Sequence, residues 1–143
     1  MPKARAVLDS SVVVSGIGWR RGDARAVLRL LAAGGFESWR TPWITSEWAE
    51  TVQRVAETEK RWRKPNWINW LEWLKAVSKF AEDVPARKTV KRDPNDDPVI
   101  MAAVAAGAAY IVTSDYDLLD LEKPHGVGCV TPRGFLSLIL RRQ

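Results

Sequence analysis

Short apolar runs alternate along the chain with longer segments whose apolar residues recur at helical spacing. The short runs predict strands at residues 6–8, 36–40, 110–112 and 127–130. The periodic segments predict helices at residues 24–31, 44–59, 67–82 and 99–106, and a last helix that begins after residue 131. The valines at 12–14 either continue the first strand or begin a turn, and residues 84–90 hold a short strand or only a loop.

This alternation of strands and helices predicts the fold class. It is typical of a parallel sheet with helices on both faces, so we expect an α/β fold: a three-layer α/β/α sandwich with a central, mostly parallel sheet. The chain has 143 residues, and we expect a single domain over residues 1–143. In such sheets the ligand crevice lies beyond the carboxyl ends of the strands, so candidate chemistry is expected there.

Charge and cysteine content narrow the possible functions. The formal net charge of +5 favours a polyanionic partner, whereas acidic residues gather locally at 93–97 and 115–117. The single cysteine, Cys129, excludes an internal disulfide and fits a reducing cytoplasm. There is no run of about 18 apolar residues, and the first residues lack the apolar stretch of a signal peptide. We therefore expect a cytoplasmic protein without a membrane segment.

Two aspartates closely follow predicted strands. Asp9 ends the run at 6–8, and Asp115 comes shortly after the run at 110–112. Taken alone, each is more typical of a turn in which the Asp side chain bonds its own backbone. On adjacent parallel strands, however, the two carboxylates would lie close together, which is unfavourable unless a cation lies between them. The pair therefore predicts a cation site at this edge of the sheet.

Two further acids are candidates for the same site. Glu47 lies at the edge of the apolar stripe of its predicted helix and can reach a cleft, the alternative being a solvated acid near a helix N-terminus. Asp97 precedes Pro98 and is equally a good helix cap. Carboxylates without paired Cys or His select Mg²⁺ or Mn²⁺ over Zn²⁺. The lone histidine, His125, is expected in an exposed loop without a catalytic role.

At these acids the sequence resembles a known family. It is similar to the PIN-domain nucleases, particularly to small bacterial and archaeal VapC-like toxin components of toxin–antitoxin pairs. The similar segments are residues 7–16, 41–47, 92–100, 107–119 and 130–136. The similarity runs from residue 6 to about residue 140, and the order and spacing of the segments make it fairly specific.

The resemblance implies an α/β/α sandwich and an endoribonuclease that depends on one or two Mg²⁺ or Mn²⁺ ions. It also implies RNA as substrate, a cognate antitoxin as partner and a homodimer. The four family acids, which are both catalytic and metal-binding, fall on Asp9, Glu47, Asp97 and Asp115. Asp96 is the rival for the third place, and Asp117 is a secondary candidate. Thr113 matches the hydroxyl that supports the fourth acid.

One departure from the family pattern keeps a second interpretation open. The family usually has Thr-Asn after its first Asp, and this chain has Ser10-Ser11. Ser10 can supply the same hydroxyl, but Ser11 cannot replace the Asn amide that orients the site. The alternative is a catalytically weakened PIN fold that binds RNA or a partner protein. A signalling receiver domain is a third class, but the sequence lacks its acidic pair after the first strand and its Lys after the last.

The chain also has eight tryptophans, which is many for its length. Aromatic residues between Arg and Lys can stack on single-stranded bases, although packing is the alternative for most of them. Trp62, between Arg61 and Arg63, is the expected RNA-binding aromatic. On the helix predicted next along the chain, Trp73 and Phe80 form a second apolar seam. We expect a dimer or antitoxin contact there.

Overall fold

The computed structural model describes residues 2–19, 22–62, 66–85 and 96–142. Arg63 and most of the predicted 84–90 segment lie outside these residues. Within the described ranges, no helix combines the length and apolar character needed to cross a membrane.

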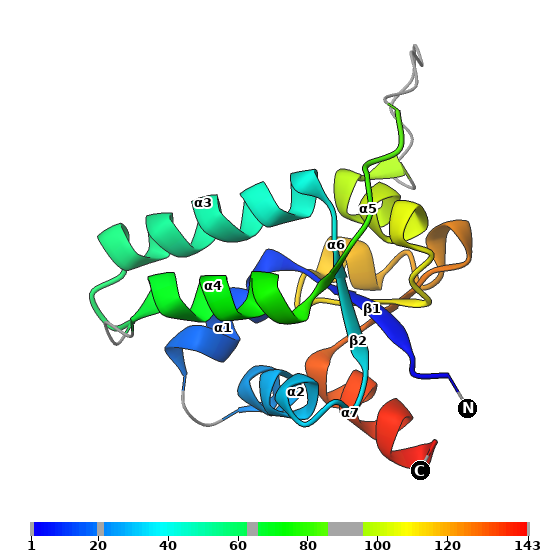
Figure 1. Ribbon diagram of the computed structural model, residues 1–143, viewed down its shortest axis with the longest axis horizontal. Helices are drawn as coiled ribbons and strands as arrows, with labels where there is room; N and C mark the ends of the chain where they lie inside the picture. Colours follow the sequence, from blue (N-terminus) through cyan, green and yellow to red (C-terminus); the bar gives the residue numbers. More distant parts are fainter. Residues whose placement is uncertain (1, 20–21, 63–65, 86–95, 143) are drawn as a thin grey trace.

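Five strands form the central sheet of the described chain. They are β1 (Arg5–Leu8), β2 (Glu37–Arg40), β3 (Lys79–Phe80), β4 (Tyr110–Val112) and β5 (Gly128–Val130). Their order across the sheet is β3-β2-β1-β4-β5, and every neighbouring pair is parallel. The predicted mostly parallel sheet is confirmed, and Figure 1 shows β1 and β2 in the middle of the molecule.

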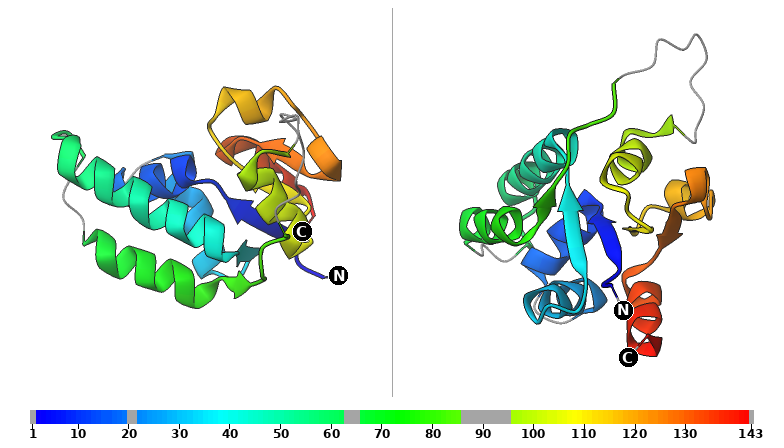
Figure 2. Two further views of the ribbon diagram at one scale, coloured as in Figure 1. Left: turned by 90° about the horizontal axis from the view of Figure 1, so that it is seen from above. Right: turned by 45° about the vertical axis from the view of Figure 1, so that its right-hand side comes forward.

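Helices cover both faces of this sheet. They are α1 (Ser10–Gly18), α2 (Asp23–Ala32), α3 (Pro42–Thr58), α4 (Trp67–Val77), α5 (Pro98–Ala106), α6 (Tyr116–Leu119), the 3₁₀ turn η2 (Pro124–Gly126) and α7 (Pro132–Arg141). Ala6, Val7 and Leu8 of β1 are all fully buried, although successive side chains of a strand point to opposite faces. Both faces are therefore covered, as Figure 2 shows, and the predicted α/β/α sandwich is confirmed.

The valines at 12–14 lie in α1, not in the strand or turn that the sequence predicts. Asp9 follows β1 directly, and its side chain accepts a hydrogen bond from the backbone N–H of Ser10 at 2.9 Å, which caps the helix. Val12 and Val13 are fully buried, and α1 packs against both α2 and α3. Burial between helices outweighs the modest helix propensity of β-branched residues.

The end of α1 packs tightly against the segment after α3. Gly18 makes this possible, because a Cβ at this position would overlap the indole ring of Trp62. Trp62 is only 3% exposed, and its indole N–H donates to the carbonyl oxygen of Val14 at 3.2 Å. The prediction that Trp62 stacks on RNA bases is therefore wrong, because its ring is enclosed by the fold. Arg61 beside it is exposed.

The helix predicted over residues 67–82 ends at Val77, earlier than expected. Ser78 is extended, and its hydroxyl lies 2.7 Å from the hydroxyl of Ser38 on β2. The backbone N–H of Ala81 donates to the carbonyl of Arg40 at 3.0 Å, which closes the pairing of β3 with β2. Pairing with a strand about 40 residues away in sequence thus overrides the local helical pattern.

This early helix end separates two residues that the sequence places on one seam. Trp73 remains on α4 and packs edge to face against Trp70, with ring centroids 5.8 Å apart. Phe80 lies on β3, where the guanidinium of Arg40 sits 5.1 Å from its ring centre. The predicted shared seam of Trp73 and Phe80 is therefore wrong, and any partner contact at Trp73 must stand without Phe80.

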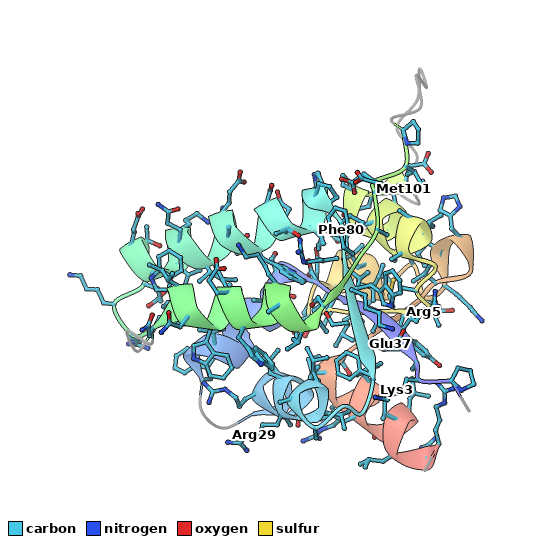
Figure 3. The ribbon with its side chains drawn as sticks, viewed as in Figure 1. Lys3, Arg5, Arg29, Glu37, Phe80 and Met101 are labelled. Carbon is cyan, nitrogen blue, oxygen red and sulfur yellow. The ribbon has the colours of Figure 1, made fainter. Side chains whose placement is uncertain are left out.

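The amino ends of three strands are joined by charged side chains. Glu37 accepts from the ammonium of Lys79 at 2.7 Å and lies 3.5 Å from the Nε of Arg5, so the contacts run across β3, β2 and β1. Figure 3 shows Arg5 and Glu37 next to one another. The hydrogen bond from Lys79, followed by one from the indole of Trp39, lowers the pKa of Glu37 below its usual value.

Candidate functional site

A cavity of about 440 Å³ lies where β1 and β4 end. All four acids singled out from the sequence line it, and each comes from a different element. Asp9 follows β1, Glu47 lies on α3, Asp97 precedes α5 and Asp115 follows β4. Residues up to 106 positions apart in sequence thus meet at one edge of the sheet.

The strand order explains the position of this cavity. β1 and β4 are adjacent, with Leu8 paired to Val112. The chain continues from β1 to β2 on one side of the sheet and from β4 to β5 on the other, so the two connections leave in opposite directions. A crevice forms at such a switch point, beyond the carboxyl ends of the two strands.

Asp9 is the most firmly held of the four acids. It is 7% exposed, and its carboxylate accepts three hydrogen bonds. One comes from the backbone N–H of Ser10 at 2.9 Å, one from the hydroxyl of Ser11 at 2.9 Å and one from the hydroxyl of Thr113 at 2.8 Å. The last two both reach Oδ2, so the orientation of the carboxylate is set by α1 and β4 together.

The same two hydroxyls also hold the loop after β4. Ser11 accepts from the backbone N–H of Ser114 at 3.1 Å, and Thr113 accepts from the backbone N–H of Asp115 at 3.0 Å. The expected hydroxyl support comes from Ser11, while Ser10 contributes its backbone N–H. The hydroxyl of Thr113 thus supports both acids: it donates to the carboxylate of Asp9 and accepts from the backbone N–H of Asp115. Ser11, at the position where the family usually has Asn, therefore takes part in the bonding that orients the site.

Asp97 and Asp115 share a second kind of support. Oδ1 of Asp97 accepts from the backbone N–H of Val99, and Oδ1 of Asp115 accepts from the backbone N–H of Asp117, both at 2.9 Å. Each acid thereby caps the helix that follows it. No described residue donates to Oδ2 of either acid, so capping leaves one oxygen of each for a ligand.

Glu47 reaches the cavity from α3, together with two residues that sequence reasoning missed. Trp43 and Thr51 also line the cavity, and they lie four residues before and four residues after Glu47. Positions four apart share one face of an α-helix, so this spacing was the available signal. The three side chains form a stripe along α3 that makes one wall of the site.

Comparison with protein-family models gives one match, to the PIN domain, over residues 5–117. The matched region is well over half of the chain and contains all four acids. The chain belongs to the PIN-domain family. Neither the curated proteins nor the solved structures contain a significant match to the chain. PIN domains are generally nucleases, so this fold is of the nuclease type and nucleic acid is the substrate class it suggests.

The four acids of this PIN domain differ from Glu37 in their ion pairing within the described chain. None of Asp9, Glu47, Asp97 and Asp115 forms an ion pair with a Lys, Arg or His of the described chain. Among the same residues, no three Asp, Glu, His or Cys side chains are grouped closely enough to hold one ion as they stand. Four carboxylates around one cavity are the oxygen donors that a hard divalent cation prefers, so the donor set fits Mg²⁺ or Mn²⁺.

Two secondary candidates from the sequence, Asp96 and Asp117, do not line the acid cavity. Asp96, the rival to Asp97, does not line the cavity, and its Oδ1 lies 3.0 Å from Nε2 of the exposed His125. Asp117 is exposed and contributes its backbone N–H to the fourth acid. The structure thus brings the first-choice acids together and leaves the secondary ones at the periphery.

Cys129 on β5 lies close to the acids of the PIN domain. Burial raises the pKa of its thiol, and the negative charges of Asp97 and Asp9 raise it further. The cysteine is 8% exposed and packs within the core. A buried thiol with a raised pKa is a poor nucleophile, so it does not supply the attacking group.

Proposed function

We propose that this PIN domain is an endoribonuclease that depends on Mg²⁺ or Mn²⁺. The observation that carries the proposal is the convergence of Asp9, Glu47, Asp97 and Asp115 on one cavity at the switch point of the sheet. The net charge of +5 favours a polyanion, while the local acids need a cation before a phosphate can approach them. We propose RNA as the nucleic acid because the sequence motifs resemble those of VapC-like toxins.

The chain's own residues divide the work between holding a cation and fixing the geometry. Asp9 offers a carboxylate whose direction is set by three donors, and Asp97 and Asp115 each offer the oxygen not used in capping. Glu47 faces them from α3. When bound, one or two divalent ions supply a more acidic water and offset charge on the phosphate.

The proposal is tested by incubating the purified protein with a panel of RNAs in Mg²⁺, Mn²⁺ or chelator. We expect cleavage with either ion and none with chelator. Asp9→Asn keeps the side-chain shape and the cap to α1, yet should lower the cleavage rate by at least roughly 100-fold. Asp120→Asn makes the same chemical change at an exposed position outside the cavity and should cleave like the wild type. Full activity in a folded Asp9→Asn protein would overturn the assignment.

A second function is favoured by one observation. Because no three of the described acidic, histidine or cysteine side chains are grouped tightly as they stand, the domain could bind RNA or a partner without cutting. Retention of labelled RNA on the protein, with no cleavage in either metal ion, would support this weakened PIN fold. Cleavage in Mn²⁺ that chelator abolishes would reject it.

The biological role we propose is that of a cytoplasmic toxin with a cognate antitoxin, as a homodimer. This role rests on the VapC-like resemblance. Trp73 is the remaining candidate for a partner contact, since it lines a 390 Å³ pocket between α2 and α4 together with Trp70. Trp73→Glu should change the oligomeric state in light scattering or weaken antitoxin binding. A small antitoxin-like reading frame beside the gene would support the role independently.

A further inference from the structure

Five of the eight tryptophans stabilise the fold through hydrogen bonds or packing. The indole N–H groups of Trp48, Trp62 and Trp39 donate to Leu8, Val14 and Glu37, respectively. Trp70 and Trp73 pack against each other on α4, away from the acids. Trp43 differs, because it lines the acid cavity and its indole nitrogen makes no hydrogen bond to any described residue.

Trp43 is well fixed by its backbone. It lies in the first turn of α3, two residues after Thr41, whose hydroxyl caps the helix by accepting from the N–H of Ile44. The backbone N–H of Trp43 donates to Oδ2 of Asp83 at 2.9 Å. The side chain is half-buried, with part of it packed on the core and the rest facing the cavity. The ring is therefore a prepared surface that needs little ordering when a ligand arrives.

The rest of the cavity suits a planar, apolar group beside a charged one. Val14, Pro98, Val99 and Leu118 line it together with the acids, so apolar and carboxylate groups share one space of about 440 Å³. That size is within the range of roughly 300–1,000 Å³ that holds small molecules. A nucleotide has both parts, since its phosphate needs the cation site and its base needs an aromatic or apolar surface.

We infer that Trp43 is a base-stacking residue of the site, against which the nucleotide next to the cleaved phosphate places its base. This inference rests on the proposed function and adds a residue that sets substrate specificity. A base can lie on the indole ring only when it is free of its own pairing and stacking neighbours. The nucleotide at the cut must therefore be unpaired, and the base contributes to binding through its face, with little dependence on hydrogen-bonding edges.

The test uses short single-stranded RNAs that each carry one 2-aminopurine, placed at successive positions, with Ca²⁺ in place of Mn²⁺. Stacking on an indole quenches 2-aminopurine, so we expect one position to be quenched by the wild-type protein. Trp43→Leu should lose that quenching and bind roughly 5- to 150-fold more weakly. Trp43→Phe should restore part of both, and Trp19→Leu, which removes an exposed indole outside the cavity, should behave like the wild type.

A second measurement closes a thermodynamic cycle. An RNA with an abasic site at the quenched position should bind the wild type more weakly, yet should bind Trp43→Leu as well as the intact RNA does. Equal quenching in the wild type and in folded Trp43→Leu, or equal loss on base removal in both, would overturn the inference. Thermal unfolding of each variant shows whether it is folded. If Trp43→Leu does not fold, the same comparisons with Trp43→Phe decide whether the inference holds.

The quenching and cleavage measurements test the stacking residue and the nuclease activity separately. Wild-type cleavage in Mn²⁺ without any quenching that depends on Trp43 would reject the stacking residue alone. Quenching that depends on Trp43 without cleavage would reject the nuclease and keep the stacking residue. A wild-type protein that neither quenches nor cleaves any of the RNAs would reject both.

Discussion

Replacing Thr113 by valine tests whether the site is held together as its hydrogen bonds indicate. Thr113 is fully buried, and its hydroxyl both donates to Oδ2 of Asp9 at 2.8 Å and accepts from the backbone N–H of Asp115 at 3.0 Å. Valine has nearly the same shape but offers neither bond. The substitution therefore removes two interactions while it leaves the packing volume almost unchanged.

The cost can be estimated from these two bonds. A hydrogen bond to a charged carboxylate is worth about 1.5–3 kcal/mol, and one between neutral groups about 0.5–1.5 kcal/mol. The sum predicts a loss of about 2–4.5 kcal/mol of unfolding free energy. At about 3 °C per kcal/mol for a chain of this length, Tm should fall by about 6–14 °C. Cleavage should slow by roughly 10- to 100-fold, because the first acid loses one of the groups that orient it.

Urea unfolding and cleavage in Mn²⁺ measure the two effects on the same preparations. Thr58→Val is the matched control, because its hydroxyl is exposed and bonds only to the carbonyl of Arg54, one turn earlier. That control should stay within about 0.5 kcal/mol of the wild type. If Thr113→Val and Thr58→Val were equally stable, the buried link between β1 and β4 would not exist as described, and the account of the site would fail.

Two further predictions concern the frame around the site. Glu37→Gln should lower the unfolding free energy at neutral pH by less than about 1 kcal/mol. Because the fold lowers the pKa of Glu37, its contribution is present above the unfolded value of about 4.5 and is lost as the pH falls through the folded value. Unfolding curves of variant and wild type should thus converge in acid, and a difference that grew there would contradict the ion cluster. Gly18→Ala should cost about 1–3 kcal/mol, because its methyl group overlaps the indole of Trp62. Adding Trp62→Phe to this variant should recover part of the loss. Thermal melts measure both effects, and an unchanged Tm in Gly18→Ala would contradict the close packing.

Strands and site acids that depend only on the local sequence could be predicted. The strands around Val7 and Ile111 are short apolar runs; Asp9 follows the first directly, and Asp115 lies three residues after the end of the second. Because the carboxyl ends of parallel strands share one edge, adjacency of these strands was enough to bring Asp9 and Asp115 together. Glu47 could be placed because its position on the helix rim depends only on spacing.

Features decided by distant partners were not predictable from the sequence. The strand at residues 79–80 forms because it pairs with β2, and its two residues carry no sequence pattern that predicts this pairing. The burial of Trp62 depends on the absence of a side chain at Gly18, 44 positions earlier. The hydroxyl of Thr113 bonds its near neighbour Asp115, as the motif suggests, but it also donates to Asp9, 104 residues away, which the motif does not indicate.

The two ends of the sheet differ in how their negative charge is compensated. At the amino ends, the negative charge of Glu37 is compensated within the fold by Lys79 and Arg5. At the carboxyl ends, Asp9, Glu47, Asp97 and Asp115 form no ion pair with a described residue. A divalent cation bound among these four carboxylates would offset their negative charge. Binding of a divalent cation in the cavity should therefore raise the free energy of unfolding of the whole domain, even when no RNA is present.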